Sequence, residues 1–181
     1  TGRQSRILKH PGASAVLYLS AVLYIPGQNR VAGLSSDNLL VLFDPAGDGV
    51  REVRLDAPIG TQGKHAQRVA VNAMGTELAI CGDSIVHVWD TQSWKRKASY
   101  PLAMAEPDLV CFSPDGRLLL CSGSRGCRAG PPFHMVQALD LPSGAIKYSF
   151  DAVVLSAVFS PDGRFLICGE GGEIVVRDAQ T

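Results

Sequence analysis

The sequence lacks a net charge, a large basic block and any long apolar run. Its 17 lysine and arginine residues balance 17 aspartate and glutamate residues, and its largest basic cluster is Lys95-Arg96-Lys97. Proteins that bind nucleic acid normally concentrate positive charge on one face, so nucleic acid is not an expected partner. No apolar run reaches the length of a membrane span, so a membrane-spanning segment is not expected either.

Motifs for catalysis, metal binding and cofactor binding are also missing. The five cysteines form no C-x-x-C pair and the four histidines are scattered, which argues against a zinc site. A G-x-S-x-G nucleophile elbow is absent, and Gly60–Lys64 lacks the flanking residues that a phosphate-binding loop requires. We therefore expect no enzyme activity and no cofactor.

What is present is the composition of a folded domain with a core. Apolar residues make up 46% of the chain and charged residues 19%, which excludes the composition of a disordered protein. Four of the cysteines, at positions 81, 111, 121 and 168, sit among apolar neighbours rather than at loop ends, as buried free thiols of a reduced compartment do. We expect an intracellular, cytoplasmic location, with cytoskeletal, ciliary and nuclear locations left open.

Alternation of apolar and polar residues is the strongest pattern in the chain. It is clearest in Arg68–Asn72, Glu77–Cys81 and Ile85–Trp89, which are followed by the more polar run Lys95–Tyr100. A period of two places one side of each run in a core, and the breaks between the runs contain the small or polar residues of tight turns. The pattern predicts a four-stranded antiparallel meander whose last strand is solvated.

Comparable runs occur along the rest of the chain. They predict strands at Arg3–Lys9, Ala21–Ile25, Val31–Ser35, Leu39–Phe43, Val50–Leu55, Leu109–Phe112, Arg117–Cys121, Met135–Leu139, Ala145–Phe150, Leu155–Phe159, Arg164–Cys168 and Glu173–Arg177. The predicted class is therefore all-β, with one domain over residues 1–181. Its repeat units cover approximately residues 3–43, 50–89, 95–139 and 145–177.

A set of aspartates brings these units into register. Each one ends the third strand of its unit, and they are Asp44, Asp90, Asp140 and Asp178, at intervals of 46, 50 and 38 residues. The turns Ser113–Gly116 and Ser160–Gly163 are both S-P-D-G, in which proline sets φ and glycine closes the turn. Repeats of about forty residues are typical of a four-stranded unit that stacks on copies of itself.

These features resemble the WD40 family of β-propellers, whose repeats combine a Gly-His pair, an S-P-D-G turn, a turn aspartate and a closing Trp-Asp pair. Trp89-Asp90 matches the closing pair, Asp83 matches the turn aspartate, and Lys64-His65 stands where the family has Gly-His. The resemblance implies about four WD40-like blades. Because the family usually has seven, it also implies an open arc of a larger propeller.

The resemblance implies a structural hydrogen bond between His65 and Asp83 that staples the second blade. His10 and Asp37 are a second candidate pair. The third and fourth repeats lack the leading histidine, so we expect packing alone to hold them together. His87 alternates with valines on its strand and is predicted to face outward.

Connections of variable length are the candidate recognition surface. They cover residues 9–20, 56–66, 101–107 and 122–134, and in the WD40 family such connections lie on one face. The last of them contains nine extra residues and includes Arg125, Arg128, Phe133 and His134, types that protein interfaces favour. A surface elaboration that binds nothing is the alternative for this insertion.

From these features the chain is predicted to be a non-catalytic protein–protein interaction scaffold whose partners are other proteins. The alternative is a recognition module attached to a catalytic or signalling domain, such as a kinase, NTPase or hydrolase, outside this segment. Sequence on either side of the segment would discriminate between the two.

Overall fold

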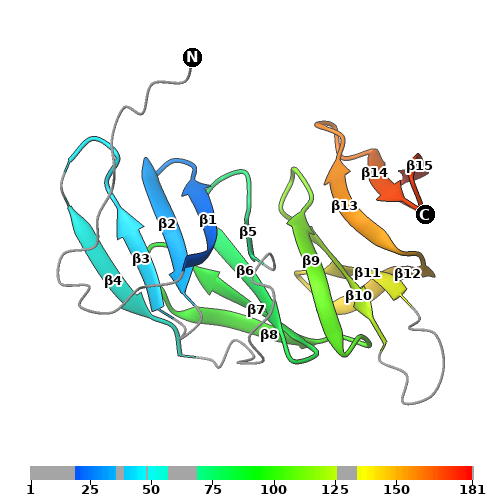
Figure 1. The fold of residues 1–181 in the computed structure, drawn as a ribbon, viewed down its shortest axis with the longest axis horizontal. Coiled ribbons are helices and arrows are strands. Elements are labelled where there is room, and N and C mark those ends of the chain that lie inside the picture. The colour runs from blue at the N-terminus through cyan, green and yellow to red at the C-terminus, as the bar shows by residue number, and fades with distance from the viewer. Residues whose placement is uncertain (1–18, 36–38, 48, 57–68, 126–133, 181) are drawn as a thin grey trace.

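The computed structural model describes residues 19–35, 39–47, 49–56, 69–125 and 134–180. In these ranges the chain forms fifteen β-strands and no helix (Figure 1), which confirms the all-β class. Each strand predicted there is present, with ends that differ by three residues or fewer. The strand predicted at Arg3–Lys9 lies outside the described residues.

The strands form four antiparallel sheets. The first contains β1 (Leu19–Ile25), β2 (Arg30–Ser35), β3 (Leu39–Phe43) and β4 (Val50–Arg54). The second contains β5 (Val69–Val71), β6 (Glu77–Gly82), β7 (Ile85–Asp90) and β8 (Arg96–Pro101). The third contains β9 (Glu106–Phe112), β10 (Leu118–Ser124), β11 (His134–Asp140) and β12 (Ala145–Asp151). The fourth contains β13 (Val154–Phe159), β14 (Phe165–Glu170) and β15 (Glu173–Asp178).

The sheets divide the chain at different points from the predicted repeat units. The strands β4, β8 and β12 open the units predicted at 50–89, 95–139 and 145–177. Each of them nevertheless pairs with the third strand of the preceding unit and completes that sheet. Consecutive sheets are therefore linked by a chain that passes from the outer strand of one sheet to the first strand of the next.

The three largest core clusters lie between consecutive sheets, because alternate side chains of each strand point to opposite faces. In the second sheet, Leu78 and Trp89 pack against the first sheet, whereas Ala79 and Val88 pack against the third. We call the side of a sheet that faces the following sheet its forward face, and the other side its backward face. All four of these side chains are at most 3% exposed, and complete burial of one valine or leucine contributes about 1.5–3 kcal/mol.

The sheets pack in chain order into an open arc. Strand β1 contacts β5, strands β5 and β6 contact β9, and β13 contacts β9 and β11. In Figure 1 the fourth sheet does not return to the first, so the sheets do not close into a ring. This arrangement confirms the predicted open arc of blades.

The third-strand aspartates share a local role. Each carboxylate accepts a hydrogen bond from a backbone N–H two or three residues further along: Ala46 for Asp44, Ser93 for Asp90, Ser143 for Asp140 and Gln180 for Asp178. The hydrogen bonds from Ser93 lower the pKa of Asp90. Because an aspartate that bonds its own backbone favours a turn, these residues mark where each third strand ends.

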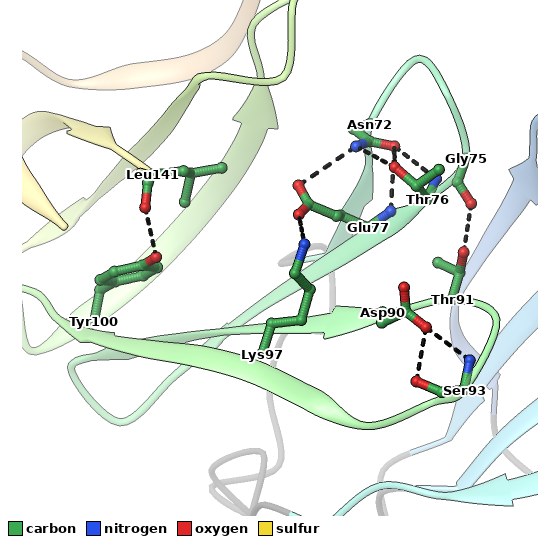
Figure 2. Close-up of polar contacts among 10 residues, drawn as sticks. All are labelled: Asn72, Gly75, Thr76, Glu77, Asp90, Thr91, Ser93, Lys97, Tyr100 and Leu141. Carbon is green, nitrogen blue, oxygen red and sulfur yellow. Dashed lines mark hydrogen bonds and ion pairs between the residues drawn. The ribbon is translucent and has the colours of Figure 1, made fainter. Parts of the chain in front are cut away.

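Polar contacts fasten the turn between β5 and β6 (Figure 2). The Asn72 carboxamide oxygen accepts the Thr76 N–H at 2.9 Å, and the Thr91 hydroxyl donates to the Gly75 carbonyl. The Gln28 side chain reaches across from the first sheet and donates to the Thr91 hydroxyl at 2.8 Å. These bonds join the short turns of the first two sheets.

The second sheet is also tied to the third (Figure 2). The Tyr100 hydroxyl on β8 donates to the Leu141 carbonyl at 2.8 Å, while Lys97 forms an ion pair with Glu77 within the second sheet. The Tyr100 bond thus joins the end of β8 to the short turn that follows β11.

The third and fourth sheets are held by more than packing, contrary to the expectation from the missing histidines. In the third sheet the Ser122 hydroxyl donates to Asp108 Oδ1 at 2.8 Å. In the fourth, Arg177 donates to Glu170 at 2.9 Å, and its guanidinium lies 4.4 Å from the ring centroid of Phe150 on the third sheet. Other polar side chains therefore replace the staple that the repeat pattern lacks.

Three of the cysteines behave as predicted. Cys81, Cys121 and Cys168 are free thiols with at most 1% of their surface exposed. Cys81 and Cys121 meet between the second and third sheets with their sulfur atoms 3.6 Å apart. Cys111 is also a free thiol, but its residue is only half-buried. Desolvation of its sulfur atom nevertheless raises the pKa of the thiol to about 12. Cys127 lies outside the described residues.

Candidate partner-binding face

An antiparallel meander places its connections at two opposite ends. At one end lie the short turns between first and second strands and between third and fourth strands. At the other end lie the connections between second and third strands and the links from one sheet to the next. We call this second end the long-connection end, because the longest stretches of sequence between consecutive described strands separate strand ends that lie there, Arg54 from Val69 and Ser124 from His134.

The base of the insertion is closed by strand pairing. Ser124 at the end of β10 pairs with His134 at the start of β11. The Ser124 carbonyl accepts the Ala105 N–H at 2.9 Å, and the His134 carbonyl accepts the Ala152 N–H at 3.2 Å. Both ends of the insertion are therefore attached to the links that enter and leave the third sheet.

The predicted partner-binding residues fall on both sides of this base. Arg125 is exposed immediately after β10, and His134 is half-buried as the first residue of β11. The other two candidates, Arg128 and Phe133, lie outside the described residues. The structure brings Arg125 and His134 to one hairpin base, where the strands hold the backbone in place.

The connection predicted at residues 101–107 differs from the expectation. Strand β8 continues to Pro101 and β9 begins at Glu106, so only four residues link the two strands. Leu102 and Met104 are buried in the core between the second and third sheets, at 7% and 1% exposure. This link is a packed part of the core, because its apolar side chains gain more from burial than from exposure.

The predicted staple involves one residue that the structure describes. Asp83 is exposed in the two-residue turn between β6 and β7 and has a φ of 46°. His65 lies outside the described residues, as do His10 and Asp37 of the second candidate pair. The pairing of His65 with Asp83 therefore stays a prediction.

A contact that the sequence did not predict secures Trp89. Its indole N–H donates to Asp56 Oδ1 at 3.1 Å, and the Asp56 carboxylate lies 3.7 Å from the Arg96 guanidinium. Because a buried indole N–H needs an acceptor, a buried Trp89 implies that some other residue accepts its hydrogen bond. The sequence could not identify the acceptor, because Asp56 lies 33 residues away on the link that follows β4.

The outward position predicted for His87 is wrong. His87 is 8% exposed and lies on the backward face of β7 beside Trp89, with the two ring centroids 5.6 Å apart. Its Nδ1 atom is 2.7 Å from the Ser99 hydroxyl. Burial, reinforced by the positive charge of Arg96, lowers the pKa of His87 from its ordinary value of 6.5, while Asp56 acts weakly in the opposite direction.

The lowered pKa of His87 predicts a pH dependence of stability. The unfolded chain binds a proton at pH values where folded His87 stays neutral, so stability is lost as the pH falls below about 6.5. We expect the free energy of unfolding, measured with urea, to fall more between pH 7.5 and pH 5.5 in the wild type than in His87→Gln. Equal pH profiles for the two proteins would show that His87 does not carry this dependence.

Among the residues that the structure describes, no group of three or more histidine, cysteine, aspartate or glutamate residues could hold a metal ion. A helix long and apolar enough to cross a membrane is likewise not found in the described ranges.

Comparison with protein families gives one match. The model described as WD domain, G-beta repeat, matches residues 145–178, which comprise β12 and the three strands of the fourth sheet. A search of curated proteins found no match. Residues 145–178 are thus a WD40 repeat, and the succession of antiparallel sheets in this chain fits a segment of a WD40 propeller.

Proposed function

We propose that this chain is a non-catalytic protein–protein interaction scaffold that recognises its partners through the long-connection end. WD40 repeats generally mediate interactions between proteins, and residues 145–178 are such a repeat. The observation that carries the proposal is the base of the insertion, where Ser124 and His134 hold an exposed arginine on a fixed hairpin. Binding residues on loops that a rigid sheet positions are the common arrangement in recognition proteins.

The two ends of the arc also differ in whether their side chains are bonded within the chain or exposed. At the short-turn end, the Thr91 hydroxyl bonds to the Gly75 carbonyl and accepts a hydrogen bond from the Gln28 side chain. At the long-connection end, Arg125 follows the last residue of β10 and is exposed. Arginine is among the residues most often found at the energetic centre of interfaces, so we assign Arg125 a direct contact with the partner. The proposed partners are other proteins in the cytoplasm.

The proposal predicts that Arg125→Asp lowers partner recovery at least about tenfold in quantitative affinity purification from cells, as expected for an arginine at the centre of an interface. Arg125 is exposed, so the variant is expected to fold with an unchanged thermal midpoint. The matched control is Arg117→Asp, because Arg117 is also exposed but follows a short turn at the opposite end. Loss of the same partners from both variants, or from neither, would contradict recognition through the long-connection end.

A further inference from the structure

Two cysteine side chains meet where the second and third sheets pack together. Cys81 on β6 and Cys121 on β10 are 40 positions apart in the chain, and their Sγ atoms lie 3.6 Å apart. We call these two residues the buried cysteine pair, because each is at most 1% exposed within the same core cluster. Cys111 and Cys168 also share a cluster, between the third and fourth sheets, but the described residues show no sulfur–sulfur contact there.

The separation of the two sulfur atoms is close to that of a covalent bond. To form a disulfide, the Sγ atoms have to approach from 3.6 Å to about 2.05 Å. Packed sheets lie about 10 Å apart, so this approach requires only a small adjustment of β6 and β10. The fold has thus already brought together two residues that are distant in the sequence.

The closed core protects the pair from oxidants. The hydrogen bond with Cys81, together with burial, raises the pKa of the Cys121 thiol well above its ordinary value. Because the thiolate is the form of cysteine that reacts, the packed core keeps Cys121 in an unreactive state. Oxidation of the pair therefore requires the core to open locally.

The four-residue link between β8 and β9 is a segment whose opening can expose the pair. Leu102 and Met104 on this link pack in the same cluster as the two cysteines. The backbone N–H of Ala103 donates to Gln137 Oε1 at 2.8 Å. Gln137 stands directly opposite Cys121 in the pairing of β10 with β11. The Gln137 side chain therefore holds the link closed beside the pair.

We propose that the buried cysteine pair is an oxidation site, at which a peroxide that enters through this link forms a disulfide between the second and third sheets. One thiol loses its proton to solvent, and its sulfur atom attacks one peroxide oxygen. The O–O bond breaks, and the departing hydroxide takes up a proton and leaves as water. The second sulfur atom then displaces the oxygen of the resulting sulfenic acid, which leaves as a second water while the S–S bond forms. Two electrons have passed from the sulfur atoms to the peroxide.

The disulfide locks the second sheet onto the third. It joins residues 40 positions apart, and a cross-link of this kind restricts the unfolded chain. The oxidised protein is therefore harder to unfold at this joint than the reduced protein. This modification goes beyond the function proposed above, because it involves none of the residues assigned to partner binding.

Peptide mapping of the oxidised protein tests the proposal. Each of the five cysteines lies on a different tryptic peptide, with Cys81 on residues 69–95 and Cys121 on residues 118–125. The folded chain is treated with hydrogen peroxide, the remaining thiols are alkylated, and the unreduced digest is analysed by mass spectrometry. We expect the peptides 69–95 and 118–125 to be linked in most of the chains. Unmodified thiols, a link between any other pair of peptides, or cysteine sulfinic acid in place of the link would overturn the proposal.

Substitutions of single cysteines show whether the link depends on this pair. Cys81→Ala and Cys121→Ala are each expected to abolish it. Cys111→Ala is the matched control, because Cys111 lies in the neighbouring cluster, and it is expected to keep the link. Loss of the link in Cys111→Ala as well would contradict a reaction confined to the pair.

The rate of linkage tests entry through the link between β8 and β9. Gln137→Leu removes the acceptor of the Ala103 N–H and is expected to speed disulfide formation about threefold or more, as the loss of one hydrogen bond that holds the link implies. Trp89→Phe weakens the contact between the first and second sheets instead and is expected to leave the rate unchanged. Equal rates for Gln137→Leu and the wild type would contradict entry at this position.

The thermal midpoint tests the lock. We expect the oxidised chain to unfold at a temperature about 5 °C or more above that of the reduced chain, and dithiothreitol to reverse the shift. A disulfide that forms without raising the midpoint would contradict the lock. None of these measurements depends on Arg125, so failure of this proposal is distinguishable from failure of the proposed function.

Discussion

Replacing Trp89 by alanine is expected to lower the free energy of unfolding by about 3–5 kcal/mol, as large-to-small substitutions of buried aromatic residues do. The indole is completely buried between the first and second sheets, where it packs in one cluster with Leu78 and Ile80. Its removal leaves a cavity and takes away the N–H that bonds Asp56. Urea denaturation followed by circular dichroism measures the effect.

Two further substitutions separate the contributions to the cost of Trp89→Ala. Trp89→Phe keeps an aromatic ring but loses the N–H, so it is expected to cost less than the alanine substitution. Val22→Ala removes apolar atoms from a side chain that is 67% exposed and should change stability by less than about 0.5 kcal/mol. A cost for Trp89→Ala as small as that of Val22→Ala would mean that the contact between the first two sheets does not limit stability.

Replacing Gly75 by alanine is expected to cost about 2 kcal/mol or more, because a left-handed backbone conformation alone costs about 1–2 kcal/mol for a residue with a side chain. Gly75 has a φ of 68°, and a Cβ atom there would lie 1.8 Å from the carbonyl oxygen of Pro26 in the first sheet. Backbone atoms of the two turns would have to separate, and the contact of Gln28 with Thr91 would be strained with them. The midpoint of urea unfolding reports the loss.

Gly171 offers a matched control for this substitution. Its φ is 55°, but a Cβ atom there would meet nothing within 4 Å. Gly171→Ala is therefore expected to show the backbone cost without the collision. If both variants lost the same free energy of unfolding, then the close approach of the first and second sheets at Pro26 would contribute nothing to the cost of Gly75→Ala.

The strands and turns could be predicted because their signals are local. Alternation over five or six residues located each strand within a few residues, and the S-P-D-G sequences located two turns whose glycines, Gly116 and Gly163, have φ values of 71° and 70°. The repeat unit predicted at 145–177 coincides closely with the span 145–178 that matches the WD40 model. Each of these features depends on residues close together in the chain.

Contacts between distant residues could not be predicted in the same way. His87 was predicted to face solvent because it is polar and alternates with valines, but both faces of β7 are buried between neighbouring sheets. Alternation tells which residues share a face and not which neighbour covers that face. The prediction that residues 101–107 belong to the recognition surface differs from the structure for a related reason, since the burial of Met104 depends on the position of the third sheet.

The sequence by itself determined the order of strands and turns and the repetition of the antiparallel unit, because these depend on local pattern. Only the tertiary structure decided that Asp56 bonds Trp89, that His87 is buried beside Trp89, and that polar contacts support the third and fourth sheets. The physical reason is that a strand with two apolar faces is compatible with a neighbour on either side. Which side is filled depends on how the sheets are arranged in space.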